Sequence, residues 1–160
     1  MALIPLNKDD YWKATILWQP PCKWNKEDKG VYLNKKYRGE YGIYRFERRH
    51  GSQKRSRENL YIGIAFEQIF DERLHQGFHE KKVKHVGSQI WVSVGLIDLK
   101  DAKHLRKRYE EIEKILIYFT KPTLNLRKKG WAPEDYFEIT NKAYRGPLPK
   151  YIRYPVAEVY

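Results

Sequence analysis

Two short segments, YGIYRFE at residues 41–47 and NLYIGIA at residues 59–65, decide the fold. Both are rich in aromatic and β-branched residues, which are typical of β-strands. A polar stretch around Gly51 and Ser52 separates them, and two strands joined by a polar loop indicate a β-hairpin with a long connection. Basic residues in or beside this connection are Arg48, Arg49, Lys54, Arg55 and Arg57.

Two helices and one further strand are predicted after the hairpin. Residues 66–76 have apolar positions at helical spacing, and Gly77 then gives a stop signal. The segment IWVSVGLI (90–97) is apolar at both parities, which predicts a central strand. Apolar residues recur three and four apart over 105–119, and Pro122 ends this second helix. The order β–β–α–β–α predicts an α+β domain in which helices cover a small mixed sheet.

Two segments flank this pattern. Residues 1–39 hold an apolar patch at 14–18 that two prolines follow, and we expect an N-terminal extension packed on the core. Residues 128–160 contain many aromatic rings among prolines, and we expect an irregular C-terminal extension folded back on the domain. We therefore predict a single domain with its core at residues 40–127.

The composition favours a polyanionic partner. Lys and Arg number 32 against 20 Asp and Glu, a formal net charge of +12. Nucleic acid is the first partner that this surplus suggests, and an anionic membrane is the second. No apolar run approaches the ~20 residues that span a bilayer, no signal-peptide pattern is visible, and no basic amphipathic helix has a clear lipid face. The single cysteine, Cys22, excludes an internal disulfide framework and fits an intracellular, cytoplasmic setting.

The two predicted strands also resemble a known family. Tyr41-Gly42-Ile43-Tyr44 and Tyr61-Ile62-Gly63 are similar to the paired tripeptides of the GIY-YIG nucleases. Arg73, Glu113 and Asn125 follow in the family's order, and the resemblance covers residues 40–127. It implies a small three-stranded antiparallel sheet flanked by helices. It also implies an endonuclease that hydrolyses phosphodiester bonds in DNA with one divalent metal, Mg²⁺ or Mn²⁺.

The resemblance assigns a role to each matching residue. Tyr44 and Tyr61 would be the catalytic tyrosines, and Arg73 would contact the phosphate. Glu113 would be the metal ligand, and Asn125 would brace the site. We favour Tyr44 as general base and Tyr61 as the residue that positions water and phosphate, although the opposite assignment stays open.

The proposed reaction explains these residue types. A phosphodiester attacked by water gains negative charge in the transition state, and an arginine places a fixed positive charge against it. One carboxylate can hold Mg²⁺ while water and phosphate oxygens fill the other positions. A tyrosine with a pKa near 10 is a weak base in water, but a nearby metal or arginine makes its phenolate more accessible.

The chain departs from the family's pattern at two positions. Many members carry His or Tyr one helical turn after the arginine, where this chain has Gly77, and some carry Lys where it has Ile64. His79, just beyond the predicted helix, is the first candidate for the missing helper, and His85 is the second. The departure at Gly77 also motivates an alternative function, a nucleic-acid-binding module of the same fold with weak or no cleavage.

Every candidate has a purely structural alternative. Paired tyrosines often pack across a sheet, a helical arginine is often a surface charge, and acids in a charged tract are mostly solvated. Basic tracts outside the site are candidates for phosphate contacts with salt-sensitive affinity. They are Arg48, Arg49, Lys54, Arg55, Arg57, Lys81, Lys82, Lys84, Arg127 and Lys128. Because no second DNA-binding domain or zinc motif is recognisable, we expect a compact restriction-type or phage-type enzyme that acts on double-stranded DNA as a homodimer.

Overall fold

A computed structural model describes residues 12–25, 30–31, 34–49, 57–76, 89–100, 105–126, 136–154 and 158–159. The strands in these ranges are β1 (Trp12–Trp18), β2 (Cys22–Asn25), β3 (Gly30–Val31), β4 (Gly42–Arg49), β5 (Arg57–Ala65), β6 (Gln89–Leu99), β7 (Phe137–Ala143), β8 (Tyr151–Tyr154) and β9 (Glu158–Val159). The helices are α1 (Lys35–Arg38), α2 (Phe70–Leu74) and α4 (Leu105–Thr120).

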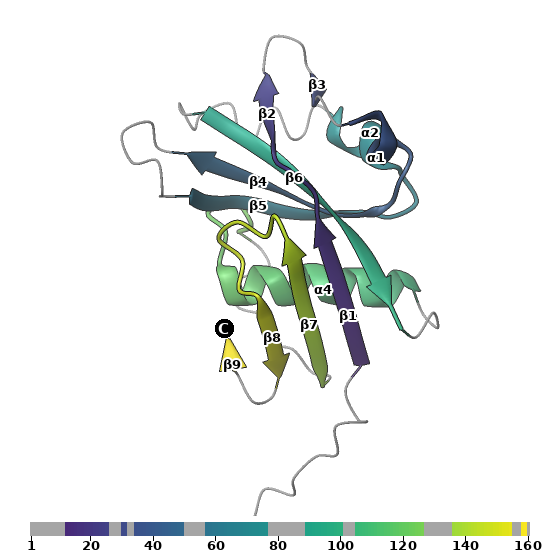
Figure 1. The fold of residues 1–160 in the computed structure, drawn as a ribbon, viewed down its shortest axis with the longest axis vertical. Coiled ribbons are helices and arrows are strands. Elements are labelled where there is room, and N and C mark those ends of the chain that lie inside the picture. The colour runs from purple at the N-terminus through teal and green to yellow at the C-terminus, as the bar shows by residue number, and fades with distance from the viewer. Residues whose placement is uncertain are drawn as a thin grey trace, which may run out of the picture.

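All of these strands join one large mixed sheet (Figure 1). One hydrogen-bonded path runs β3-β2-β6-β1-β7-β8-β9, and the hairpin of β4 and β5 attaches to β6 through β4. Strands β1 and β7 run parallel, whereas the other pairs are antiparallel. The prediction of a small three-stranded sheet is therefore wrong.

The sheet is larger than predicted because β6 has pairing partners beyond the hairpin. The three predicted strands do pair in the antiparallel order β5-β4-β6. Strand β6, however, is 11 residues long, and its second half pairs with β1 from the N-terminal segment. Strand β1 then continues the sheet into β7, so both flanking segments contribute strands to it.

The prediction of an irregular C-terminal extension is also wrong. Phe137, Ile139 and Asn141 are buried while the residues between them are partly exposed, which is the period-two pattern of a strand with one face on a core. The first predicted helix is shorter than residues 66–76, because Glu67 has a left-handed φ of 70° that a right-handed helix cannot include. The second predicted helix is confirmed as α4.

Two cores lie on opposite faces of the β4–β5 hairpin. The tyrosine-side core contains Trp24, Tyr44, Phe46, Leu60, Tyr61, Ala65, Phe70, Leu74, Ile90, Val92 and Val94. The helix-side core contains Ala14, Ile16, Trp18, Ile43, Ile62, Ile112, Ile115, Leu116, Ile117, Phe137, Ile139, Leu148 and Ile152. Helix α2 closes the first core with Phe70 and Leu74, and α4 fills the second.

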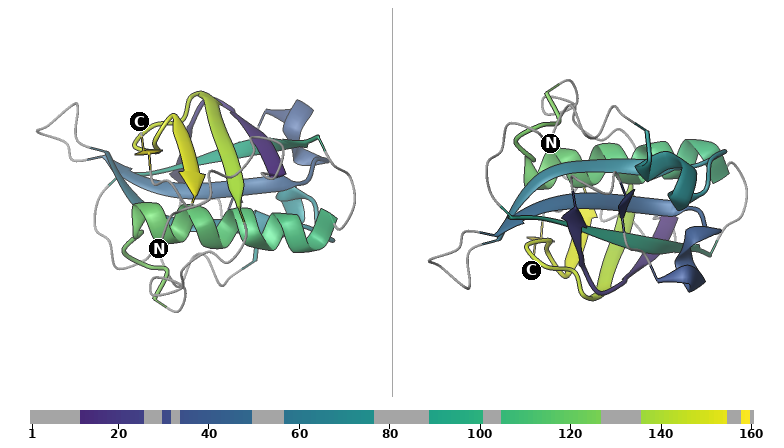
Figure 2. Two further views of the ribbon diagram at one scale, coloured as in Figure 1. Left: turned by 90° about the horizontal axis from the view of Figure 1, so that it is seen from below. Right: turned by 90° about the horizontal axis from the view of Figure 1, so that it is seen from above.

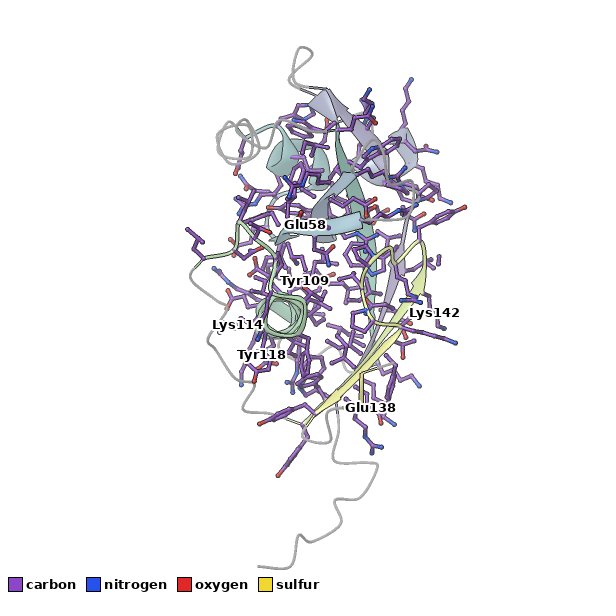
Figure 3. All side chains as sticks on the ribbon, turned by 90° about the vertical axis from the view of Figure 1, so that its left-hand side faces the viewer. Glu58, Tyr109, Lys114, Tyr118, Glu138 and Lys142 are labelled. Atoms are coloured by element: carbon purple, nitrogen blue, oxygen red, sulfur yellow. The ribbon has the colours of Figure 1, made fainter. Side chains whose placement is uncertain are left out.

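Helix α4 organises the helix-side core. It crosses behind β1, β7 and β8 in Figure 1 and runs alongside β4 and β5 in Figure 2, so that the sheet curls around it. Figure 3 looks along α4 and places Lys114 on the side away from β7, the strand that carries Glu138 and Lys142. The helix thus buries one face against the sheet and leaves the other to solvent.

A buried ion pair lies within β4, and its arginine connects the hairpin to the turn after β7. The side chains of Arg45 and Glu47 are 0% exposed, and Arg45 Nη2 lies 3.6 Å from Glu47 Oε2. Arg45 also donates hydrogen bonds to the backbone carbonyls of Tyr144, at 2.7 Å, and Arg145. Gly146 has a φ of 59°, and a Cβ there would lie 2.5 Å from Arg45 Nη2. Burial lowers the pKa of Arg45 to about 10, against the attraction of Glu47, so the guanidinium stays charged at neutral pH.

We predict that Glu47→Ala lowers the free energy of unfolding by about 3–5 kcal/mol, because it leaves a buried guanidinium without its counter-charge. Urea denaturation measures this change. The control is Glu110→Ala, which breaks an exposed pair with Arg106 and should cost less than about 1 kcal/mol. Equal losses in the two variants would contradict a stabilising role for the buried pair.

Candidate functional site

Two tyrosine side chains lie next to each other on the tyrosine-side face of the hairpin. Tyr44 comes from β4 and Tyr61 from β5, and their ring centroids are 6.2 Å apart with planes at 35°. Tyr44 is 0% exposed and Tyr61 is 7% exposed. Tyr61 is therefore the phenol that solvent can reach more easily.

The second tripeptide ends in glycine for a geometric reason. Gly63 pairs directly with Tyr44 across the hairpin. A Cβ at Gly63 would lie 2.5 Å from the Tyr44 hydroxyl oxygen and 2.9 Å from Cε1 of Tyr61. Only a residue without a side chain leaves room for both phenols over this part of β5.

Arg73 joins the two tyrosines from α2. It donates a hydrogen bond to the Tyr44 hydroxyl, and its Nη1 donates to Gln76 Oε1 at 2.8 Å. Its Nε is buried and has no hydrogen-bond partner among the described residues. Because Phe70 and Leu74 anchor α2 in the tyrosine-side core, the guanidinium is held at the site by packing.

Glu113 approaches from the other side, on α4. It is 6% exposed, although most acids in a charged helical tract are solvated. Its negative charge raises the pKa of both Tyr44 and Tyr61, which places it close to the two phenols. Glu111, two residues earlier, instead accepts a hydrogen bond from Arg108 at 2.7 Å.

Both phenols are protonated at neutral pH. Burial raises the pKa of Tyr44, and the charges of Tyr61 and Glu113 add to it, while Arg73 lowers it. Burial also raises the pKa of Tyr61, as does Glu113, while Arg73 and a hydrogen bond from Tyr44 lower it. The sequence predicted that an arginine would make a phenolate accessible, but in this structure desolvation outweighs that attraction.

Asn125 braces the strand that carries Tyr61 and Gly63. Its side-chain amide makes two buried hydrogen bonds with the backbone of Ile62, accepting from the N–H at 2.8 Å and donating to the carbonyl at 2.8 Å. The N–H of Leu124 donates to the carbonyl of Leu60 at 2.8 Å. The segment after α4 therefore covers the edge of β5, which fixes the backbone on both sides of Tyr61.

The structure thus brings together five of the six catalytic candidates and leaves the sixth undescribed. His79 lies outside the described residues, as do Lys54, Arg55, Lys81, Lys82, Lys84, Arg127 and Lys128. Arg48, Arg49 and Arg57 lie at the end of the hairpin where β4 finishes and β5 begins. The sequence interpretation missed Gln76, which its spacing of three residues from Arg73 on a predicted helix could have indicated.

The donor atoms at the site suit a hard cation. Among the described residues, no group of three or more His, Cys, Asp or Glu side chains could hold a metal ion. Glu113 is the carboxylate whose charge acts on both phenols. Because Mg²⁺ commonly binds through one or two carboxylates and keeps several water and phosphate ligands, this donor set fits a divalent cation shared with a substrate.

Comparison with protein-family models, curated proteins and solved structures finds no match for this chain. Within the described ranges, no helix is both long enough and apolar enough to cross a membrane.

We predict that Gly63→Ala destabilises the protein by about 1–3 kcal/mol, the usual cost of overpacking a core. The added methyl group would force both tyrosine rings to move. Gly39→Ala is the control, because a Cβ at Gly39 meets no atom within 4 Å, and it should change stability by less than about 0.5 kcal/mol. Thermal or urea unfolding of both variants tests this packing, and unchanged stability of Gly63→Ala would contradict it.

Proposed function

We propose that this protein is a metal-dependent DNA endonuclease that hydrolyses phosphodiester bonds. The observation that carries the proposal is the convergence of two phenols, a guanidinium and a carboxylate from β4, β5, α2 and α4. The net charge of +12 supports a polyanionic substrate. The resemblance of the two tripeptides to those of GIY-YIG nucleases supports the same reaction.

Packing alone does not account for this arrangement. Burying a polar or charged group costs free energy unless it is paired, and apolar residues would fill the space more cheaply. Clusters of buried titratable groups that perturb one another are typical of functional sites. The site also draws on segments from four places in the chain, as catalytic sites commonly do.

In the proposed reaction, Arg73 binds the scissile phosphate and stabilises the negative charge that develops on it. Tyr61, the more exposed phenol, contacts the attacking water and the phosphate. Tyr44 is fully buried and accepts the hydrogen bond of Arg73, so it positions both Arg73 and Tyr61. This assignment reverses the preference that the sequence suggested for the two tyrosines.

Glu113 would hold the divalent cation. When bound, the cation would neutralise negative charge on the leaving oxygen. Asn125 keeps β5, and with it Tyr61, at a fixed distance from α4 through its two bonds to Ile62. The chain's own contribution is therefore to hold rigid groups around the reacting phosphate.

We further propose a compact restriction-type or phage-type enzyme in an intracellular setting. One site handles one phosphodiester bond, so a break in both DNA strands would need two subunits, and we expect a homodimer on double-stranded DNA.

Glu113→Gln should abolish cleavage of plasmid DNA in Mg²⁺ or Mn²⁺ while leaving DNA binding intact. The expected loss is roughly 10²–10³-fold, the effect of removing one electrostatic group from such a site. Glu111→Gln is the matched control on the same helix, because Glu111 is engaged with Arg108, and it should retain activity.

Two outcomes of this experiment would decide against the proposal. Cleavage at the wild-type rate by Glu113→Gln would refute the metal assignment. Binding of DNA by the wild-type chain, with no product in any divalent metal tested, would instead favour the alternative of a binding module that does not cleave.

Tyr61→Phe should lower the cleavage rate by about 10²-fold or more, as expected when a group that contacts the attacking water is lost. Tyr44→Phe should cause a smaller loss, because Tyr44 acts through Arg73 and Tyr61. Single-turnover cleavage with saturating enzyme measures both rates without a contribution from binding. The reverse order of the two losses would return the direct role to Tyr44.

A further inference from the structure

The end of the hairpin where β4 finishes and β5 begins, called here the loop end, divides its charges between two faces. Strand register places Arg48 opposite Glu58 and Arg49 opposite Arg57. Successive side chains of a strand point to opposite faces of the sheet, so the two pairs face different surroundings. On one face the basic residue Arg48 lies opposite the acidic residue Glu58. On the other face two basic residues, Arg49 and Arg57, lie opposite each other.

Arg48 is neutralised on its own face. Its Nε lies 3.0 Å from Glu58 Oε2, and its Nη2 donates to the same oxygen. Glu58 also accepts a hydrogen bond from the Thr123 hydroxyl at 2.6 Å. This pair is a closed internal contact that does not call for an external anion.

Within the described ranges, Arg49 and Arg57 share one counter-charge. Their nearest carboxylate in the described structure is the buried Glu47, at 3.3 Å from Arg49 and 3.9 Å from Arg57. Glu47 also serves Arg45 at 3.6 Å. Three guanidinium charges against one carboxylate leave a surplus of two positive charges, and the nearby Arg145 adds to the positive field at Arg45.

These contacts are long, and Arg49 Nε and Nη2 donate hydrogen bonds to Glu47 Oε1 at 3.4 and 3.3 Å. All three ion-pair distances exceed the 2.7–2.9 Å of a charge-assisted hydrogen bond. Oε2 of Glu47 is buried and accepts no hydrogen bond from the described residues. Like charges directly opposite each other on neighbouring strands are destabilising. The cluster therefore holds more guanidinium donors than its single carboxylate can satisfy.

The two outer guanidiniums are also presented to solvent. The side chains of Arg49 and Arg57 are 28% and 38% exposed, whereas Glu47 is 0% exposed. The Arg49 guanidinium stacks on the ring of Trp91 at 3.8 Å, which limits its freedom to turn. The planar guanidinium of Arg49 is thus held in place, and the fixed N–H donors of an arginine guanidinium bind phosphate oxygens well.

We propose that Arg49 and Arg57 bind one backbone phosphate of double-stranded DNA, away from the phosphate that is cleaved. The choice of DNA rests on the proposed function. Arg49 lies five residues beyond Tyr44 on β4 and on the opposite face of that strand, so its phosphate would differ from the one at the tyrosines. The site would fix the register of the duplex without reading its sequence.

The test measures how duplex binding depends on salt. Fluorescence anisotropy measures the binding of a short labelled duplex in EDTA at several NaCl concentrations. The proteins compared are the wild type, the test variant Arg49→Gln/Arg57→Gln and the control variant Arg48→Gln/Arg106→Gln. Both double variants remove two positive charges, but the control arginines have carboxylate partners of their own, whereas Arg49 and Arg57 share Glu47 with Arg45. We expect the test variant to bind several-fold more weakly and to flatten the slope of log K against log salt by about 0.9, the value for one phosphate.

The control variant should keep the wild-type slope. An equal flattening in the control would show that net charge, not this pair of arginines, sets the affinity, and a wild-type slope in the test variant would also overturn the proposal. Absence of duplex binding by the wild-type chain would overturn it as well. If the Gln variant does not fold, Arg49→Lys/Arg57→Lys should keep the slope and still bind more weakly, because lysine retains the charge but loses the planar guanidinium.

This test does not depend on cleavage. EDTA removes the divalent metal, so the slopes are measured on intact DNA. If the wild-type chain did not cleave DNA but its slope differed from that of the test variant as expected, the phosphate site would stand and the endonuclease assignment would fall. If the wild-type chain cleaved DNA but its slope equalled that of the test variant, the endonuclease assignment would stand and the phosphate site would be rejected.

Discussion

Strand β4 is buried on both faces, and the remaining structure is built around that constraint. Ile43, Arg45 and Glu47 face the helix-side core, while Tyr44 and Phe46 face the tyrosine-side core. A shift of the register by one residue would exchange these two sets. It would put the Arg45 guanidinium among the aromatic rings and remove Tyr44 from Arg73. The register of the β4–β5 and β4–β6 pairings is therefore tightly constrained. The register shift between Phe46 and Glu47 in the β4–β5 pairing lies within this constrained stretch.

Three buried polar groups of the hairpin have partners from distant segments. Arg45 contacts the turn after β7, Tyr44 contacts α2, and Ile62 is bonded by Asn125 after α4. Polar groups that are buried without partners are costly, so these contacts discourage alternative arrangements of the flanking elements. The same contacts hold the phenols, the guanidinium and the carboxylate in fixed relative positions. Fold and candidate site thus depend on one set of interactions.

Much of the hairpin and its site could be predicted from the sequence, because the signals are local. Aromatic and β-branched residues identified β4 and β5, helical spacing identified α4, and the tripeptides with Arg73, Glu113 and Asn125 identified the residues that converge. The extent of the sheet could not be predicted in this way. Strand β1 pairs in parallel with β7, more than 100 residues later, and local patterns carry no information on such pairing. The polar residues of FEITNKA concealed the alternation of β7.

Charged residues in the hairpin illustrate a different limit. In YGIYRFE, Arg45 and Glu47 alternate with aromatic residues, which is the pattern of a strand with one solvated face. Their actual burial follows from β1, β7 and the turn at Gly146, which cover that face. Once Glu47 is enclosed, its single carboxylate is shared by Arg45, Arg49 and Arg57 and cannot neutralise all three. The excess positive charge at the loop end of the hairpin is therefore a consequence of how the terminal segments pack. One face of the hairpin carries the two phenols, and the opposite face leaves charge available for a polyanion.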